Sequence, residues 1–188
     1  MTKREGLFIS AKNAANQLAR ECIVTALLQL LKEKPLSALS ISEITSRAGV
    51  SRMTYYRNYK SKEDIFVQAL SDILDEYHRE FQALSDGHSH YGDYANLLHC
   101  FTYFEKHRDF IYSLFRCGLG NLLLTSLSDY ITNTWYHPES GDTIEDFYVL
   151  QAFTGSLYST YVSWAVRGKK ETPQQLAQVL SELYAKKR

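Results

Sequence analysis

Apolar side chains along this chain recur at three- and four-residue intervals, the spacing that gives an α-helix one buried face. The pattern predicts a first long helix over residues 10–34, which Pro35 ends. A second long helix is expected over residues 62–84, because neither proline nor glycine interrupts it. Further helices are expected over residues 91–107, 108–115, 122–135, 143–167 and 172–185. No clear strand-like alternation occurs, so the predicted fold class is all-α.

The segment between the two long helices, Ser40–Lys62, contains two helix starts and a glycine turn. Ser40 and Glu43 have the spacing of a capping box. Gly49 can adopt the positive φ that ends a helix, and Ser51 can cap a second short helix. Two short helices across a glycine turn have the plan of a helix-turn-helix, whose second helix can enter the major groove of DNA.

The second short helix carries side chains suited to nucleic acid. Arg52 can fork onto a guanine edge, Thr54 can bond to a phosphate or touch a thymine methyl, and Asn58 can donate to a phosphate. Lys60 and Lys62 stand at the start of the next helix, where charge and free N–H groups together attract phosphate. Short capped helices also serve as plain connectors, but so many phosphate-competent side chains favour DNA binding. The candidate DNA contacts are Ser40, Ser42, Ser51, Arg52, Met53, Thr54, Tyr56, Arg57, Asn58, Lys60 and Lys62.

The stretch AGVSRMTYYRNYKSKEDIF resembles the DNA-binding signature of the bacterial TetR (tetracycline-repressor) family, which runs roughly Gly-Val-Ser-x-x-Thr-hydrophobic-Tyr-x-His-Phe-x-x-Lys. The matching positions are Gly49, Val50, Ser51, Thr54, Tyr56, Tyr59 and Lys62. Asn58 replaces the usual His, which still permits a phosphate contact. Met53 replaces a small residue or Pro and brings a bulkier side chain near the bases. Tyr55 occupies a usually buried aliphatic position and is expected in the core.

Charge divides the chain unevenly, although the formal net charge is zero. Residues 1–70 hold 11 Lys and Arg against 6 Asp and Glu, whereas residues 71–188 hold 10 against 15. This asymmetry fits a DNA-facing part and an acidic body that phosphate repels. We therefore expect a three-helix, helix-turn-helix DNA-binding domain over residues 1–61. A helical regulatory and dimerisation domain is expected over residues 62–188, with residues 62–84 as the connecting helix.

Two polar stretches permit more than one interpretation. Residues 2–4 could form an arm that touches phosphate or a minor groove, although a frayed terminus is the simpler interpretation. His88 and His90 alternate in the polar segment 85–92 and could bind a metal. Because no acidic or thiol partner is evident in the sequence, we expect them to be solvated, and no metal site is predicted.

Composition argues against several classes of protein. No apolar run approaches the roughly 20 residues of a membrane span, and the N-terminus lacks the features of a secretory signal. We expect a cytoplasmic protein with no membrane partner, in which Cys22, Cys100 and Cys117 are reduced. Cys100 follows His99, but adjacent residues on a helix point in different directions. Without a nucleophile–base pair or a phosphate-binding loop, neither an enzyme nor a cofactor is expected.

The expected body is rich in aromatic and hydroxyl groups, which can line an apolar ligand pocket. The same residues at helical spacing also make an ordinary core, and the sequence does not separate the two. The family resemblance implies a domain that senses a small molecule. The candidate ligand contacts are Tyr103, Phe104, His107, Phe115, Arg116, Phe147, Tyr158 and Tyr161.

The helix expected over residues 143–167 is apolar almost all round, which predicts burial on every side. One side can pack in its own subunit and the other against a partner, with Gly155 allowing close approach. A monomeric bundle is the alternative, but the resemblance implies dimerisation through the last two long helices. The candidate interface residues are Leu157, Trp164, Leu176, Val179, Leu180 and Leu183.

Taken together, these features predict a sequence-specific DNA-binding transcriptional regulator, expected to be a repressor. A homodimer would bind a palindromic operator on double-stranded DNA, because two-fold symmetry pairs the heads with two half-sites. A small molecule of unknown identity would control DNA affinity from the C-terminal domain. The alternative is a regulator or co-activator controlled by a protein partner, which a fully packed, ligand-free core would favour. A purely structural bundle would not explain the charge division.

Overall fold

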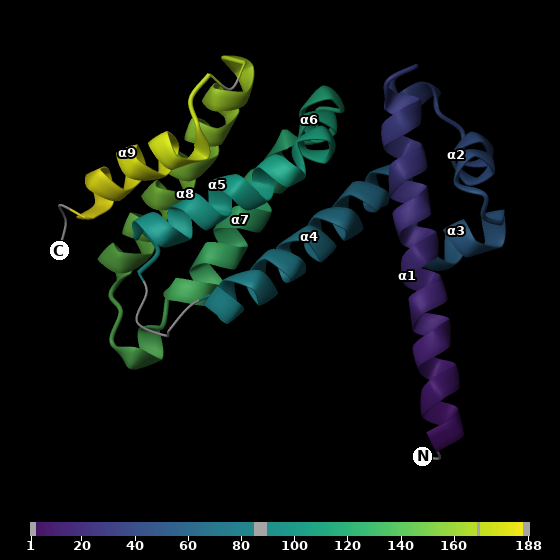
Figure 1. Cartoon of the computed structure of the whole chain (residues 1–188), viewed down its shortest axis with the longest axis horizontal. Coiled ribbons are helices and arrows are strands. Elements are labelled where there is room, and N and C mark those ends of the chain that lie inside the picture. The colour runs from purple at the N-terminus through teal and green to yellow at the C-terminus, as the bar shows by residue number, and fades with distance from the viewer. Residues whose placement is uncertain (1–2, 85–89, 169, 186–188) are drawn as a thin grey trace. The chain divides into compact units, whose positions relative to one another are not determined.

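Every regular element in the described part of the chain, residues 3–84, 90–168 and 170–185, is a helix. Figure 1 shows these helices in the computed structural model, coloured from the N-terminus to the C-terminus. The all-α class predicted from the apolar spacing is confirmed. Backbone contacts divide the chain into two units, of which the first comprises Met1–Ala69 and Ser113–Cys117.

The first helix, α1, runs from Lys3 to Leu31 and so begins well before the predicted start at Ser10. The simpler expectation of a frayed terminus is therefore wrong for the backbone of Lys3 and Arg4, whereas Thr2 lies outside the described residues. A DNA contact by this segment stays a prediction. The segment lacks proline, and a single Gly costs only about 1 kcal/mol relative to Ala within a helix. One side of α1 forms much of the core of this unit, through Ile23, Ala26, Leu27, Leu30 and Leu31.

The helix α1 ends at Leu31, earlier than the predicted end at residue 34. The N–H of Lys34 still donates to the Leu30 carbonyl at 3.0 Å, which closes a turn. Pro35 then leads into a short 3-10 helix, η1 (Leu36–Ala38). Leu36 and Leu39 are buried and anchor this connection in front of the next helix.

The predicted helix-turn-helix is present as α2 (Ile41–Ala48) and α3 (Arg52–Asn58). Both helices pack against α1 in the first unit (Figure 1). Their inward faces are apolar, so burial against α1 and the start of the following helix holds them in place. The buried side chains of this part are Ile44, Tyr55, Tyr59, Ile65 and Phe66.

The predicted second long helix is present as one continuous helix, α4 (Lys62–Leu84). Its residues to Ala69 belong to the first unit and its residues from Leu70 to the second. The sequence places the domain boundary just before Lys62, at the start of α4. That boundary between a DNA-binding and a regulatory domain stays a prediction. The buried stripe of α4 consists of Ile65, Phe66, Ala69, Leu70, Tyr77 and Phe81.

After α4 the described part of the chain continues through five more helices. These are α5 (Tyr94–Lys106), α6 (Arg108–Arg116), α7 (Gly120–Trp135), α8 (Ile144–Val166) and α9 (Pro173–Ala185). Of these, α6 ends in the segment that groups with the first unit. Within the second unit α9 packs along α5, and α7 packs against α8 (Figure 1). Its core is built mainly from aliphatic and aromatic side chains of these helices, including Leu97, Phe101, Leu123, Leu127, Ile131, Leu150, Phe153 and Leu180.

Capping sets the start of the last two helices. Thr143 caps α8 in a capping box with Asp146. A reciprocal pair of bonds also starts α9, since Gln175 N–H donates to Thr172 Oγ1 and Thr172 N–H donates to Gln175 Oε1. Such reciprocal bonds satisfy N–H groups that a helix start leaves without intrahelical partners.

Two other starts differ from the sequence prediction. Tyr91 precedes α5 instead of beginning it, because the Asp93 carboxylate accepts the His90 N–H at 2.6 Å and holds a turn there. Gly120 is the first residue of α7, so the helix starts before the predicted residue 122. Gly118, with a φ of 73°, lies in the break between α6 and α7.

Candidate functional site

The start of α2 is held by a network of side chains around Glu43. Glu43 N–H donates to Ser40 Oγ at 3.2 Å, and Ser40 N–H donates to Glu43 Oε2 at 2.9 Å. The Lys34 ammonium also bonds to the Glu43 carboxylate. The Lys34 bond, followed by the Ser40 bonds, lowers the pKa of Glu43 to about 2. Ser40 is therefore a confirmed N-cap, and the exposed Ser42 lies one residue into the helix.

The turn between the two short helices has the predicted glycine geometry. Gly49 has a φ of 67°, in the left-handed region, and its N–H donates to the Ser46 carbonyl. Ser51 then caps α3, because its Oγ accepts the Thr54 N–H at 3.0 Å. The Ser51 and Thr54 hydroxyls also lie 3.0 Å apart within hydrogen-bond distance. These local bonds start α3 at a defined residue.

The outward face of α3 presents three adjacent long side chains. Met53 is 79% exposed and Tyr56 is 54% exposed. Arg52 Nη2 donates to the Tyr56 hydroxyl at 3.3 Å, and its guanidinium lies 5.9 Å from the Tyr56 ring centre. A planar guanidinium held over a ring has fewer rotamers to lose when it binds. This face therefore combines a pre-oriented cation with an exposed apolar side chain.

The inward face of α3 is aromatic. Tyr55 is fully buried and Tyr59 is 2% exposed, with ring centres 5.6 Å apart. The expected core position of Tyr55 is confirmed. Its hydroxyl has no hydrogen-bond partner among the described residues, and burial raises the pKa of Tyr55 to about 12. Because this face is buried, the opposite face of α3 is the one that can contact another molecule.

The C-terminal end of α3 is bonded to α1. Asn58 Nδ2 donates to Asn16 Oδ1 at 3.1 Å, and Asn16 Nδ2 donates to Asn58 Oδ1 at 3.0 Å. Arg57 Nη2 also donates to Asn16 Oδ1, at 3.2 Å. The phosphate contact expected of Asn58 stays a prediction, and in this structure its amide is bonded within the protein. No sequence pattern singled out Asn16.

The two candidate lysines near the start of α4 have different surroundings. Lys60 is exposed, and its N–H donates to Asp64 Oδ2 at 2.9 Å. Lys62 is half-buried, and its Nζ donates to the Leu36 and Leu39 carbonyls at 2.6 and 2.8 Å. Two of the three donors of the Lys62 ammonium are thus bonded within the protein. A phosphate contact by either lysine stays a prediction.

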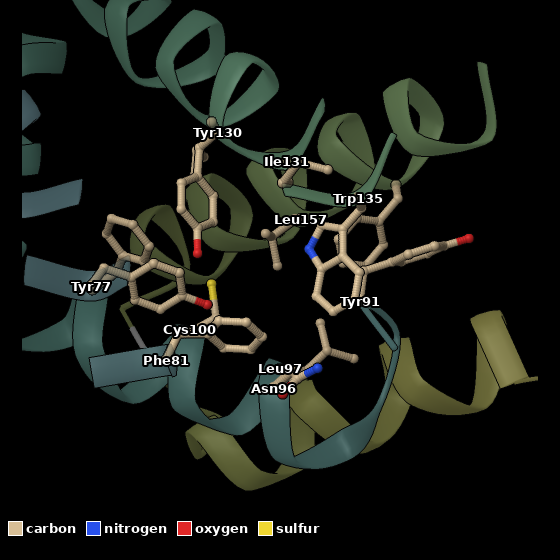
Figure 2. A pocket seen from close by; sticks show the side chains of 13 residues that line it. Tyr77, Phe81, Tyr91, Asn96, Leu97, Cys100, Tyr130, Ile131, Trp135 and Leu157 are labelled. Carbon is tan, nitrogen blue, oxygen red and sulfur yellow. The ribbon is translucent and has the colours of Figure 1, made fainter. Parts of the chain in front are cut away.

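A small cavity lies in the core of the second unit, between side chains of α4, α5, α7 and α8 (Figure 2). Its volume is about 30 Å³, which is room for one or two water molecules. Pockets that hold drug-sized ligands measure about 300–1,000 Å³. The core around this cavity is therefore nearly filled. Its lining includes Tyr77, Phe81, Tyr91, Asn96, Cys100, Phe104, Tyr130, Trp135, Phe153 and Leu157.

Neutral polar groups face this cavity. Figure 2 shows the Cys100 sulfur close to the hydroxyls of Tyr77 and Tyr130. The Tyr77 hydroxyl and the Cys100 thiol are hydrogen-bonded, and burial raises the pKa of Cys100 to about 12. Burial likewise raises the pKa of Tyr130 to about 12. Among the described residues, none of the side chains lining the cavity is charged. The chemistry suits an uncharged, ring-containing occupant.

Tyr130 also borders an open groove on the surface of the same unit. The groove measures about 370 Å³ and lies between α4 and α7, with His78 and Asn133 at its sides. His78 Nδ1 lies 3.4 Å from the Tyr130 hydroxyl. Tyr130 therefore lines both the surface groove and the cavity.

The structure brings together only part of the predicted ligand set. Phe104 lines the cavity described above, and it also lines a second cavity of about 20 Å³ with Tyr158 and Tyr161. The Tyr161 hydroxyl donates to the Phe104 carbonyl at 3.2 Å. Tyr77 and Trp135 were missed, although Tyr77 belongs to the apolar stripe that predicted the second long helix.

The remaining predicted ligand residues lie elsewhere. The Tyr103 hydroxyl donates to the Ile73 carbonyl at 2.9 Å, and the His107 ring packs on Tyr103 at 4.8 Å. Phe147 packs against Tyr136 instead, at 5.5 Å. Phe115 and Arg116 group with the first unit, where Arg116 borders a groove beside residues 31–36. None of these five lines either cavity.

A continuous stripe along α8 is exposed in the single subunit, so burial of this side by a partner stays a prediction. The stripe follows a three- and four-residue spacing and consists of Tyr148, Ala152, Gly155, Ser159, Ser163 and Val166. A Cβ at Gly155 would meet no atom within 4 Å. Small side chains in the middle of such a stripe allow another helix to approach closely.

Some of the predicted interface residues are exposed, and the others are buried or half-buried within the subunit. Val179 and Leu183, one turn apart on α9, are 63% and 54% exposed. Leu157, Trp164 and Leu180 are buried within the subunit, and Leu176 is half-buried. Trp164 Nε1 donates to the Glu171 carbonyl at 2.8 Å, which bonds the end of α8 to the turn before α9. The predicted interface residues therefore do not share one exposed surface, and a dimer interface on α8 and α9 stays a prediction.

The histidine pair considered for metal binding is only half described. His88 lies outside the described residues, and the His90 ring packs on Tyr91 at 3.9 Å. Among the described residues, no group of three or more His, Cys, Asp or Glu side chains could hold a metal ion. No helix in the same part of the chain is long and apolar enough to cross a bilayer.

These features define a class: an all-helical protein with an N-terminal helix-turn-helix and a C-terminal helical domain. Residues 23–69 match the family model described as bacterial regulatory proteins of the tetR family, and residues 94–186 match one described as a transcriptional regulator C-terminal region. The chain belongs to the TetR family of DNA-binding transcriptional regulators, and the resemblance found from the sequence is confirmed.

Similar proteins agree with this assignment. The HTH-type transcriptional regulator EthR of Mycobacterium tuberculosis is 29% identical over 68 residues, which span 36% of this chain and 32% of EthR. A TetR transcriptional regulator from Streptococcus agalactiae has a TM-score of 0.58, at 22% identity over 93% of this chain and 98% of its own. The dihydroxyacetone kinase operon activator DhaS has a TM-score of 0.56, at 18% identity over 88% and 93%. At these identities the solved structures show the fold alone.

Proposed function

We propose that this protein is a dimeric transcriptional repressor that reads a palindromic operator with α3 of each subunit. The observation that carries the proposal is the outward face of α3, where Arg52, Met53 and Tyr56 project from a helix capped at Ser51. An arginine beside an apolar side chain suits base edges in the major groove, where guanine offers two acceptors and thymine offers a methyl group.

Phosphate contacts would surround this reading face. Ser40, Ser42, Ser51 and Thr54 carry hydroxyls near the N-termini of α2 and α3, where N–H groups and the helix dipole favour phosphate. Arg57 and Lys60 add exposed cations. Such contacts set register and affinity on any sequence, whereas base contacts set specificity. The proposed division of roles is therefore reading by Arg52 and Met53, and positioning by the others.

Dimerisation would use the exposed stripe of α8 together with Val179 and Leu183 of α9. Exposed apolar side chains arranged on neighbouring helices favour a partner surface over solvent. A two-fold pair of subunits presents the same patch to itself, and it places two copies of α3 on half-sites about 34 Å apart. A dimer bound over a promoter excludes polymerase sterically, which is why repression is proposed. A DNA-binding regulator of this kind acts in the cytoplasm of a bacterium.

Control by a small molecule in the second unit is the first candidate for regulation. The neutral polar groups around Tyr77, Cys100 and Tyr130 suit an uncharged, ring-containing molecule, and displacement of the Tyr130 side chain would join the cavity to the surface groove. Binding would shift α4, which is continuous between the two units, and so change DNA affinity. By linkage, DNA must weaken ligand binding by the same factor.

A protein partner is the second candidate, because the cavity of about 30 Å³ leaves the core nearly filled. A partner that binds the outside of the second unit needs no internal space. Native mass spectrometry of the purified protein separates the candidates. Because Leu127 also lines the cavity, Leu127→Phe would fill it, and a retained small molecule that is lost in this variant supports the first candidate. A response to effector that survives Leu127→Phe supports the second.

The DNA-binding proposal is tested by selecting bound duplexes from a random-sequence library. We expect enrichment of a palindrome, and bound complexes with two subunits per duplex. Enrichment of a single asymmetric half-site by a monomer would contradict the proposed architecture. Selection from genomic fragments would then show whether the sites overlap promoters, as repression requires.

A further inference from the structure

Asn16 and Asn58 are 42 residues apart in the sequence, yet their amides bond to each other between α1 and α3. Each amide donates once and accepts once, at 3.0 and 3.1 Å. Two such bonds between the same two planar groups fix both their distance and their relative orientation. The pair therefore constrains how the C-terminal end of α3 lies against α1.

The same amides are bonded to other groups of α3. Asn16 Oδ1 accepts a second bond, from Arg57 Nη2 at 3.2 Å, which uses both lone pairs of the oxygen. Asn58 Nδ2 donates in addition to the Thr54 carbonyl at 2.9 Å. One side chain of α1 thus orders two consecutive side chains of α3. An exposed arginine ordered in this way has less rotamer entropy to lose on binding.

The charge of this contact matters as much as its geometry. Asn16 is neutral, so it orients the Arg57 guanidinium without neutralising it. A carboxylate at the same place would form an ion pair with Arg57 and reduce its attraction to phosphate. The amide keeps both the orientation and the positive charge.

We infer that Asn16 is a positioning residue for DNA recognition, which sets the tilt of α3 and aims Arg57 at the phosphate backbone without touching DNA itself. Asn16 lies in α1, outside the helix-turn-helix, and it was not among the DNA contacts predicted from the sequence. The inference rests on DNA binding through α3 and adds to it a residue that acts through Asn58 and Arg57.

A double-mutant cycle tests the inference on a duplex selected by the wild-type protein. Affinity is measured at fixed salt for Asn16→Ala, Asn58→Ala and the double variant, each well below its own Tm. We expect Asn16→Ala to weaken binding by about tenfold, and the double variant to be little weaker than either single variant. The matched control is Gln17→Ala, whose amide donates to Glu21 on the same helix at 3.2 Å, and its affinity should be unchanged.

A second variant, Asn16→Asp, should change the salt dependence of DNA binding, which a purely structural role of Asn16 would leave unchanged. The carboxylate can still accept from Arg57 but neutralises it, so the slope of log affinity against log salt should fall by about one. Additive losses in the cycle, or an unchanged affinity of Asn16→Ala with only a lower Tm, would overturn the inference. Failure of the wild-type protein to select any duplex would instead overturn DNA binding itself, and the inference with it.

Discussion

The Lys62 ammonium donates to the Leu39 carbonyl at 2.8 Å and so bonds the first turn of α4 to the residue before the α2 cap. A second bond, to the Leu36 carbonyl at 2.6 Å, reaches the 3-10 helix η1. The family signature ends at this lysine, and the sequence predicts a phosphate contact for it. In the structure, its bonds instead join the two ends of the helix-turn-helix segment.

Replacement of Lys62 by Met should therefore lower the free energy of unfolding by about 1–3 kcal/mol, because two carbonyls lose a charged donor. Chemical denaturation measures the loss. Lys60→Met is the matched control, since the Lys60 side chain is exposed: we expect unchanged stability and a salt slope of DNA binding lower by about one. If Lys62→Met left stability unchanged and reduced the salt slope instead, the phosphate contact predicted from the sequence would be correct.

Arg52→Ala should weaken binding to a selected operator by about 1–3 kcal/mol and relax sequence preference at one base pair. The reason is that a bidentate contact to guanine would be lost, while phosphate contacts remain. Fluorescence anisotropy on the operator and on a scrambled duplex measures both effects. Arg47→Ala serves as the control, because Arg47 pairs with Glu33 at 3.1 Å and should leave sequence preference intact. Equal losses on both duplexes would place Arg52 on phosphate.

Gly155→Leu should dissociate the proposed dimer while keeping the subunit folded. A side chain at this position meets open space within the subunit, and exchange of Gly within a helix gains about 1 kcal/mol of helix propensity. It would nevertheless obstruct close approach of a second α8. Light scattering after size-exclusion chromatography reports the mass, and thermal unfolding reports the fold. A stable dimer of Gly155→Leu would remove α8 from the interface and leave Val179→Glu to test α9.

Stability should fall as the pH drops below about 6.5, the ordinary pKa of histidine. Burial lowers the pKa of both His99 and His107, with Lys106 acting in the same direction and glutamates opposing it. Between the folded and unfolded pKa values the unfolded chain binds more protons, so the stabilisation present above 6.5 is lost on acidification. His99→Gln should flatten this part of the profile of unfolding free energy against pH. An unchanged profile in His99→Gln would show that other groups cause the loss.

Tyr55→Phe should raise the free energy of unfolding by about 1 kcal/mol, because the variant removes a buried hydroxyl that has no hydrogen-bond partner among the described residues. The ring, which fills the core beneath α3, is kept. Chemical denaturation of the variant beside the wild type measures the change. A loss of stability of similar size would indicate that the hydroxyl has a partner in solution, such as a buried water.

The helices and their starts could be predicted from the sequence because they depend on residues a few positions apart. The Ser40–Glu43 and Thr172–Gln175 boxes, the positive φ of Gly49 and the uninterrupted α4 all follow from local bonds and spacing. The same local character made the family signature readable. It also explains why errors fell at helix ends, such as the start of α7 two residues before the predicted residue 122.

Only the tertiary structure decided which partners the functional side chains have. Lys62 bonds to carbonyls up to 26 residues away, and Asn58 bonds to an amide 42 residues away, so no local pattern reports them. The lining of the cavity and the exposed stripe of α8 likewise depend on how helices far apart in sequence pack. Periodicity determines that a helix has an apolar face, whereas the neighbour that covers this face is set by long-range packing.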